Sequence, residues 1–167
     1  LSNCINSEVY TILVLPQYKS QPLIQHLENG WSIFSGALGH FLRIVPPQMV
    51  RGDNWYQGTA DSIRQNLEMI EREKPSHLLI LSGDHVCKMN YALFKAYHEN
   101  NDADVTIAVI ETARDQAQEY GVLQLDGYFN VTGFQEKPKN PAPIPGDPDH
   151  CLVSMGIYIF KAEVLLE

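Results

Sequence analysis

The stretch from His77 to His85, HLLILSGDH, constrains the fold more than any other part of the chain. Four consecutive apolar residues, Leu78 to Leu81, leave no polar face, which suits a strand covered on both sides in the parallel centre of an α/β sheet. Gly83 then lets the backbone turn or approach a ligand closely. Asp84 follows at the expected strand end, where open α/β sheets bind ligands and where a carboxylate can hold Mg²⁺. The alternative interpretation is that Asp84 only caps the next helix.

Strand and helix patterns alternate through the first two thirds of the chain. Runs of β-branched and aliphatic residues predict strands, and apolar residues at spacings of three and four predict helices. We expect strands at 8–15, 41–45, 77–81 and 104–110, and helices at 20–28, 59–74 and 90–99. This alternation implies βαβ units and a mixed, mostly parallel, Rossmann-like sheet flanked by helices.

The pattern changes after residue 118. Asp126-Gly127 separates two short strand patterns, which predicts a hairpin from 121–125 and 131–135. Five prolines between 137 and 148 predict an extended loop, followed by a strand at 151–160 and the start of a helix. We see neither repeats nor a second domain, so residues 1–167 are interpreted as a single α/β domain.

Two of the expected helices have distinct apolar faces. Ala60, Ile63, Leu67 and Ile70 predict one helix from Thr59 to about Lys74, ended by Pro75. In the other helix Asn90 is the expected N-cap, and we expect Leu93, Phe94 and Tyr97 to face inward.

Composition and charge restrict the class of partner. The net charge of −8 and the pI of about 5.1 disfavour non-specific nucleic-acid binding. No apolar run is long enough to span a bilayer, so we expect no membrane partner. Cys4, Cys87 and Cys151 are widely spaced without a CxxC motif, as in reduced thiols of an intracellular protein. The six histidines are scattered, and none has zinc-ligand spacing.

Four segments together resemble the sugar-1-phosphate nucleotidyltransferases, and within that family most closely the glucose-1-phosphate adenylyltransferases. They are WYQGTAD at 55–61, SGDH at 82–85, FQEKP at 134–138 and SMGIY at 154–158. Each is weak alone, but the order and the intervals are similar to those of the family. The likeness covers nearly the whole chain and implies a fold of the nucleotide-diphospho-sugar transferase type.

The resemblance implies transfer of an adenylyl group from ATP to glucose 1-phosphate, giving ADP-glucose and pyrophosphate for glycogen or starch synthesis. Such a reaction needs alignment of the attacking and leaving oxygens and cations over the phosphates. Asp84 matches the catalytic, Mg²⁺-binding aspartate of the family. The positions that match contacts to glucose 1-phosphate are Tyr56, Gly121, Glu136, Lys137 and Ser154, and those that match nucleotide contacts are Gln57, Gly58 and Thr59.

Each of these positions also has a structural interpretation. Lys137 and Glu136 could be a solvated pair, Gly121 a β-bulge residue and Ser154 a buried hydroxyl bonded to backbone. Thr59 could be a helix cap, and Trp55 and Tyr56 could be core anchors. Arg72 matches an arginine implicated in binding a regulatory nucleotide in some relatives, but it lies among charged residues as on an ordinary solvated helix face.

The resemblance also predicts parts outside the sequence given. We expect a Gly-rich phosphate loop with an arginine before residue 1, and a second metal-binding aspartate and a β-helix domain beyond residue 167. The chain is then an incomplete catalytic domain, nearly inactive by itself. The full-length protein is expected to be a homo- or hetero-tetramer in a bacterial cytoplasm or a plastid stroma. The alternatives are a relative that uses another nucleotide or sugar, and a non-catalytic regulatory subunit.

Overall fold

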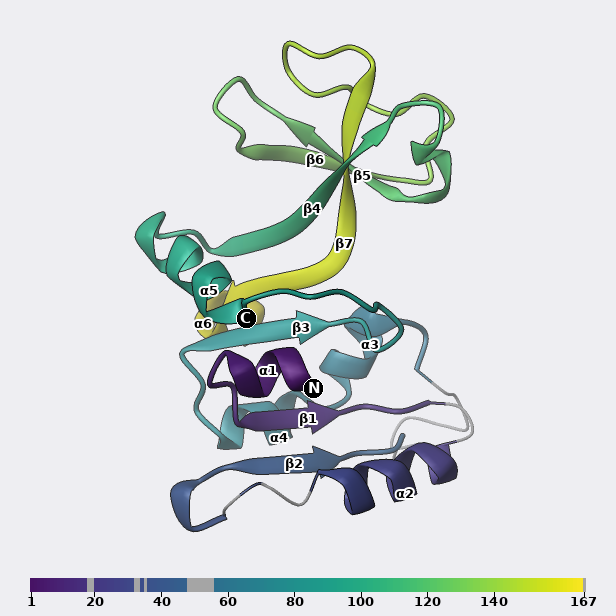
Figure 1. The fold of residues 1–167 in the computed structure, drawn as a ribbon. Helices are drawn as coiled ribbons and strands as arrows, with labels where there is room; N and C mark the ends of the chain where they lie inside the picture. Colours follow the sequence, from purple (N-terminus) through teal and green to yellow (C-terminus); the bar gives the residue numbers. More distant parts are fainter. Residues whose placement is uncertain (18–19, 32–33, 35, 48–55, 167) are drawn as a thin grey trace. The chain divides into compact units, whose positions relative to one another are not determined.

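The computed structural model describes residues 1–17, 20–31, 34, 36–47 and 56–166 (Figure 1). It divides into two compact units, which are described separately. The first unit consists of residues 1–75, 87–100 and 166, and the second of residues 76–86 and 101–165. Trp55, which belongs to the motif at 55–61 and was alternatively interpreted as a core anchor, lies outside the described residues.

The first unit contains a parallel pair of short strands. β1 (Thr11–Val14) pairs with β2 (Phe41–Ile44) in a register that opposes Thr11 to Phe41. The helix α2 (Ser20–Gly30) lies along β2, and side chains from both elements line a common hollow (Figure 1). The remaining elements of this unit are α1 (Ser2–Asn6), a 3₁₀ turn η1 (Gly36–Leu38), α3 (Thr59–Arg64), α4 (Leu67–Arg72) and α5 (Tyr91–Asn100).

The single helix expected from Thr59 to Lys74 is two helices, so that prediction is wrong. Asn66 stands between α3 and α4 with φ −115° and ψ 12°, outside helical geometry. Its side-chain amide donates hydrogen bonds to the carbonyl oxygen of Ser62 at 2.7 Å and to the hydroxyl of Tyr56 at 3.1 Å. A buried asparagine that bonds nearby backbone in this way competes with the helical ladder, which apolar spacing alone does not reveal.

The helix α5 begins as expected, but its buried face is different. The side chain of Asn90 accepts hydrogen bonds from the backbone N–H groups of Ala92 at 2.9 Å and Leu93 at 3.2 Å, which confirms the N-cap. Leu93 and Tyr97 are 69% and 62% exposed, so their predicted inward orientation is wrong. The buried residues of this helix are Tyr91 and His98, because the helix turns another face inward.

The second unit is an antiparallel sheet built around one long strand. β7 (His150–Lys161) pairs with β3 (His77–Leu81), with β4 (Val105–Ala113) and with β5 (Gly121–Leu125), which in turn pairs with β6 (Val131–Glu136). A 3₁₀ turn η2 (Ala117–Glu119) precedes β5, and α6 (Ala162–Leu166) follows β7. The mixed α/β class is confirmed, but the pairings described are parallel only between β1 and β2. The expected parallel pairing of the stretch Leu78 to Leu81 is wrong, since β3 pairs with β7 in the antiparallel sense.

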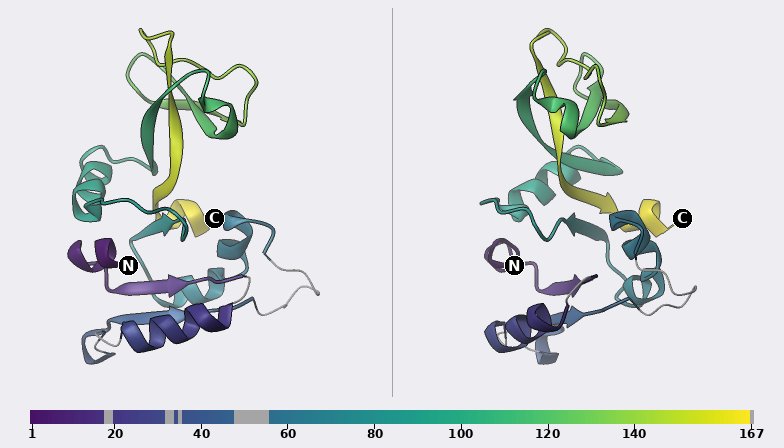
Figure 2. Two further views of the ribbon diagram at one scale, coloured as in Figure 1. Left: turned by 45° about the vertical axis from the view of Figure 1, so that its right-hand side comes forward. Right: turned by 90° about the vertical axis from the view of Figure 1, so that its right-hand side faces the viewer.

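The strand β7 changes partners at a β-bulge. Ile107 of β4 opposes Tyr158, but Val109 opposes Ser154, so three residues of β7 stand against one of β4. Within this bulge Gly156 has φ +67°, a left-handed conformation that glycine adopts at little cost. β7 bends as it passes from the part beside β3 to the part beside β5 (Figures 1 and 2).

The predicted hairpin is confirmed, with a longer turn than a two-residue connection. The carboxylate of Asp126 accepts hydrogen bonds from the backbone N–H groups of Tyr128 at 2.8 Å and Asn130 at 2.9 Å. Phe129 takes a positive φ of 64° to close the turn. Beneath the hairpin a small core is completely or nearly completely buried, and it consists of Ala117, Val122, Cys151 and Val153, with Ala142 packed against it.

All three cysteines are free thiols, which agrees with the expectation of reduced cysteines. Burial raises the pKa of the thiols of Cys4 and Cys151. Among the described residues, none of the helices combines the length and the apolar character that a membrane crossing requires.

Candidate active site

Asp84 lies in the exposed loop that follows β3. Its carboxylate accepts a hydrogen bond from the hydroxyl of Ser82. The pKa of Asp84 is lowered, mainly because this hydrogen bond stabilises the charged form. An exposed, ionised carboxylate is an oxygen ligand of the kind that Mg²⁺ prefers, and Mg²⁺ commonly combines one or two carboxylates with substrate phosphates. The residue therefore fits the metal role that the sequence suggested.

The neighbouring residue fixes this loop to β7. Nδ1 of His85 lies 2.9 Å from the carbonyl oxygen of Met155. A carbonyl oxygen only accepts hydrogen bonds, so Nδ1 is the protonated nitrogen. Leu81 also opposes Ile157 in the β3–β7 ladder. The Ser-Gly-Asp-His loop and the Ser-Met-Gly bulge, two segments far apart in the sequence, are thus held side by side.

Three of the expected sugar-contact positions form a row across the sheet. Val122 opposes Val153, and in an antiparallel pair the next residues in register are Gly121 and Ser154. Gly121 in turn opposes Glu136. Residues that oppose one another across antiparallel strands direct their side chains to the same face. Ser154 and Glu136 therefore share a face, with a glycine between them.

Gly121 is also required for packing. A Cβ atom at this position would collide with the ring of Phe134, two residues before Glu136 on β6. A β-bulge does occur in this hairpin, but it lies between Gln124 and Leu125, so the bulge interpretation of Gly121 is wrong. The absence of a side chain is explained by the phenylalanine ring that covers the backbone.

Ser154 is half-buried and bonded within its own strand. Its Oγ accepts a hydrogen bond from the backbone N–H of Gly156 at 3.2 Å and lies 3.1 Å from the hydroxyl of Tyr158. These contacts agree with the buried-hydroxyl interpretation and also orient the Oγ atom next to the bulge.

Lys137 is exposed at the end of β6 in an unusual conformation. Its φ of +43° is left-handed, although it is not a glycine. Its backbone N–H donates to the carbonyl oxygen of Tyr120 at 3.1 Å, which continues the pairing one residue beyond Gly121. Such a conformation costs a residue with a side chain about 1–3 kcal/mol and occurs in turns, as at Phe129, and at functional sites. The structure thus holds Lys137 next to the row of Gly121 and Glu136.

Two side chains that the sequence did not single out anchor the proline-rich loop after Lys137. Gln135 accepts a hydrogen bond from the backbone N–H of Ala142 at 3.0 Å. Arg114 donates to the carbonyl oxygen of Pro141 and to the side chain of Asn140, both at 2.8 Å. Arginine and glutamine bonds to a distant loop leave no pattern in the sequence that could have predicted them.

The expected nucleotide segment lies in the first unit, at the start of α3. Gly58 has φ +145°, which only glycine adopts without strain, and it occupies the N-cap position. Thr59 is the first residue of the helix, and its expected capping role is wrong, because no side chain caps this end. The carboxylate of Asp61 instead accepts from the backbone N–H of Gln57 at 3.0 Å. Asp61 thus fixes the loop that precedes the helix.

Tyr56 is 5% exposed, as the core-anchor interpretation requires. Its hydroxyl accepts the hydrogen bond from Asn66 described above. The side chain of Gln57 is exposed, as are Gly58 and Thr59. The segment therefore combines one buried anchor with three exposed residues that are free of core packing.

Arg72 lies in the last turn of α4 and forms an ion pair with Glu68 one helical turn earlier. The two side chains are 74% and 81% exposed. This is the geometry of an ordinary solvated helix face, where such pairs contribute little.

Five of the ten expected site residues belong to the sheet of the second unit or to the residues that directly follow its strands, namely Asp84, Gly121, Glu136, Lys137 and Ser154. The other five, Tyr56, Gln57, Gly58, Thr59 and Arg72, belong to the first unit. The residues in the second unit are brought together by strand pairing. In the first unit, Tyr56, Gln57, Gly58 and Thr59 lie together because they form the turn into α3.

Comparison with known families gives the class of protein to which this sheet and its carboxylate-bearing loop belong. The nucleotidyl transferase family model matches residues 1–167, so the chain belongs to that family.

The relatives give a more particular likeness. The chain is 48% identical over its full length to a glucose-1-phosphate adenylyltransferase of Rhodopirellula baltica and 47% identical to one of Paramagnetospirillum magneticum. It is also 47% identical, over 99% of its length, to glucose-1-phosphate adenylyltransferase 2 of Vibrio vulnificus. The chain covers 38%, 39% and 41% of these three proteins, so it spans about two fifths of their length.

Proposed function

We propose that this chain forms part of the catalytic domain of an enzyme that transfers an adenylyl group from ATP to glucose 1-phosphate, with release of pyrophosphate. The reaction supplies ADP-glucose for glycogen or starch synthesis. Membership of the nucleotidyl transferase family and the names of the relatives support the reaction class. We also propose that the protein acts as a tetramer in a bacterial cytoplasm or a plastid stroma.

The observation that carries the proposal is the arrangement along β7. The loop with Asp84 is bonded to Met155 at the bulge, and the adjacent residue Ser154 begins the row that continues through Gly121 to Glu136. A carboxylate for a metal ion and polar groups for a sugar phosphate are thus supplied by one sheet. Phosphoryl transfer depends chiefly on such positioning and on charge stabilisation.

Each residue of the second unit has a proposed role. Asp84 holds Mg²⁺, which when bound neutralises charge on the phosphates of the nucleotide. The ammonium group of Lys137 binds the phosphate of glucose 1-phosphate as a point charge. Glu136 and Ser154 bind sugar hydroxyls, and Gly121 contacts the sugar through its backbone, beside the ring of Phe134.

The segment before α3 is proposed to bind the nucleotide. Gln57 can read the edge of a base through its amide, which offers both a donor and an acceptor. The conformation of Gly58 keeps side-chain atoms away from the base, and Thr59 offers a hydroxyl beside it. We also propose that Tyr56 contacts glucose 1-phosphate. Its hydroxyl already accepts a hydrogen bond from Asn66.

The test is pyrophosphate release by the full-length protein with ATP, glucose 1-phosphate and Mg²⁺. Asp84→Asn should lower kcat at least about a hundredfold, while Lys137→Ala should raise the KM for glucose 1-phosphate about 10- to 100-fold. Asp115→Asn and Lys139→Ala are matched controls on exposed loop positions of the same unit and should behave as wild type. An unchanged kcat in Asp84→Asn would contradict the proposed metal role.

The same assay distinguishes the proposed enzyme from the two alternative functions suggested by the sequence. An enzyme specific for another nucleotide or sugar would release pyrophosphate only with that substrate pair. A regulatory subunit would bind ATP and glucose 1-phosphate without turnover, although the presence of both Asp84 and Lys137 argues against it. Arg72→Ala should leave turnover unchanged and alter only the response to a regulatory nucleotide if its effector role holds.

A further inference from the structure

We propose that Glu111, Asp147 and His150 form a binding site for a divalent transition-metal ion of the zinc class. These residues belong to the second unit, in β4, in the turn before β7 and at the start of β7. They are distinct from the residues proposed for the reaction, so the inference does not depend on the proposed function.

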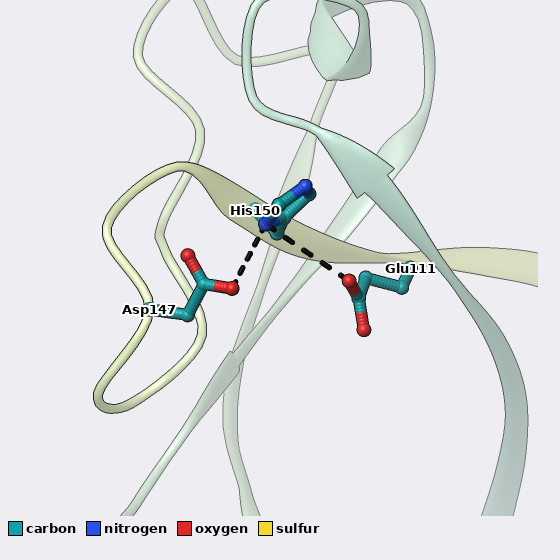
Figure 3. Close-up of side chains that lie close together, drawn as sticks. All are labelled: Glu111, Asp147 and His150. Carbon is teal, nitrogen blue, oxygen red and sulfur yellow. Dashed lines mark hydrogen bonds and ion pairs between the residues drawn. The ribbon is translucent and has the colours of Figure 1, made fainter.

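The three side chains converge on one point (Figure 3). Nδ1 of His150 lies 2.8 Å from Oδ2 of Asp147 and 3.9 Å from Oε1 of Glu111. One ligand atom from each of the three residues lies within 4.8 Å of the other two. Both carboxylates are directed toward the same imidazole nitrogen (Figure 3).

These separations suit a tetrahedral ion. Zinc binds histidine nitrogen and carboxylate oxygen at 2.0–2.2 Å, which places neighbouring ligand atoms about 3.4 Å apart. The observed values of 2.8 Å and 3.9 Å lie on either side of that spacing. A movement of about half an ångström by exposed side chains would bring these two separations to the tetrahedral spacing, and the carboxylate oxygens of Glu111 and Asp147 lie within 4.8 Å of each other.

A hydrogen-bonded ion pair explains only part of this arrangement. The bond between His150 and Asp147 has normal length, but Glu111 is too far from Nδ1 for a hydrogen bond. The side chain of Glu111 is 62% exposed and is nevertheless directed at the imidazole. Glu111 also forms an ion pair with the imidazole at this distance, so a metal ion would replace a proton between the three ligand atoms.

The backbone holds the ligands in place. His150 opposes Ala113 in the β4–β7 ladder, and Glu111 lies two residues before Ala113, on the same face. Asp147 is fixed by a bridge to Ile144 and accepts a hydrogen bond from the N–H of Asp149 at 3.0 Å. A site built on strands and a closed turn loses little conformational entropy when an ion binds.

The ligand set favours zinc over magnesium or calcium. Magnesium and calcium are bound by oxygen, whereas imidazole nitrogen selects zinc and similar ions. Three protein ligands leave a fourth position for water, and the exposure of the cluster gives water access to it. A bound ion would tie the end of the proline-rich loop to two strands of the sheet.

The experiment is calorimetric titration of Zn²⁺ into the full-length protein, after treatment with EDTA and removal of any affinity tag. We expect one site whose affinity falls at least about tenfold in His150→Gln and in Asp147→Asn. His26→Gln, an exposed histidine on α2, is the matched control and should bind as wild type.

Two outcomes would overturn the inference, namely no Zn²⁺ binding by the wild type or unchanged binding by His150→Gln. A second measurement is independent of affinity. Co²⁺ should give the visible absorption of a four-coordinate complex in the wild type and lose it in Glu111→Gln, and a spectrum identical in the two proteins would contradict the role of Glu111. Circular dichroism of each variant checks that the fold is retained.

Discussion

Nδ1 of His85 donates a hydrogen bond to the carbonyl oxygen of Met155 at 2.9 Å, joining the loop of Asp84 to the bulge of β7. The contact links two segments that are separated by most of the second unit in the sequence. We propose from this contact that His85 positions Asp84.

Replacement of His85 should therefore act through Asp84. We expect His85→Ala to lower kcat about 10- to 100-fold, as loss of a residue that orients a metal ligand commonly does. His85→Asn should restore much of the activity, because its side-chain amide can donate to the same carbonyl oxygen. Steady-state kinetics of the full-length protein check this. Equal defects in the two variants, or a change in KM alone, would contradict the positioning role.

The bulge itself can be tested at Gly156. Gly156→Ala should destabilise the protein by about 1–2 kcal/mol, because its φ of +67° is strained for any residue with a Cβ atom. The added atom would lie 3.6 Å from Cβ of Ser82, an ordinary contact, so the effect arises from backbone strain and not from a clash. Gly127→Ala is the control, since that position is open and its φ is not left-handed. Urea denaturation measures both, and equal stability of the two variants would contradict the prediction.

Asn66, at the break between α3 and α4, is predicted to contribute to the stability of the protein through its side-chain hydrogen bonds. Asn66→Ala should destabilise the protein by about 1–3 kcal/mol, because it removes buried hydrogen bonds to Ser62 and Tyr56. Tyr56→Phe removes only one of them and should cost less. A double-mutant cycle in urea denaturation measures the coupling between Asn66 and Tyr56, and full additivity would show that the bond contributes nothing.

Asp61 gives a prediction about pH. The pKa of Asp61 is lowered from 3.8, first by the hydrogen bond from the N–H of Gln57 and then by that from Arg64. A carboxyl with a depressed pKa in the folded state stabilises the protein above its unfolded pKa, and this contribution is lost as the pH falls through the folded value. Asp61→Asn should therefore lower the urea midpoint at pH 7.

The difference between Asp61→Asn and the wild type should shrink as the pH falls below about 3.8, where the carboxyl of the unfolded chain becomes protonated, and should vanish below the lowered pKa of the folded state. Urea midpoints measured from pH 7 to the lowest pH at which the protein stays folded test the sign. A difference that grows on acidification would contradict the assigned hydrogen bonds. Glu68→Gln, an exposed residue on α4, serves as the control and should show little effect at any pH.

The sequence alone determined the local elements and the motif positions. The apolar run of Leu78 to Leu81, the Asp126-Gly127 turn and the Asn90 cap each depend on interactions within a few residues, so their patterns can be read directly. The family resemblance likewise followed from short motifs in a fixed order. These features are local, because the interactions that cause them join residues close in the sequence.

Only the tertiary structure decided which distant residues meet. β3 pairs antiparallel with β7, Gly121 is covered by Phe134, and His150 lies between Glu111 and Asp147. Strand register and bulges set these contacts through backbone hydrogen bonds, which every residue except proline can make. Because those bonds are nearly independent of side-chain identity, the sequence pattern could not show them.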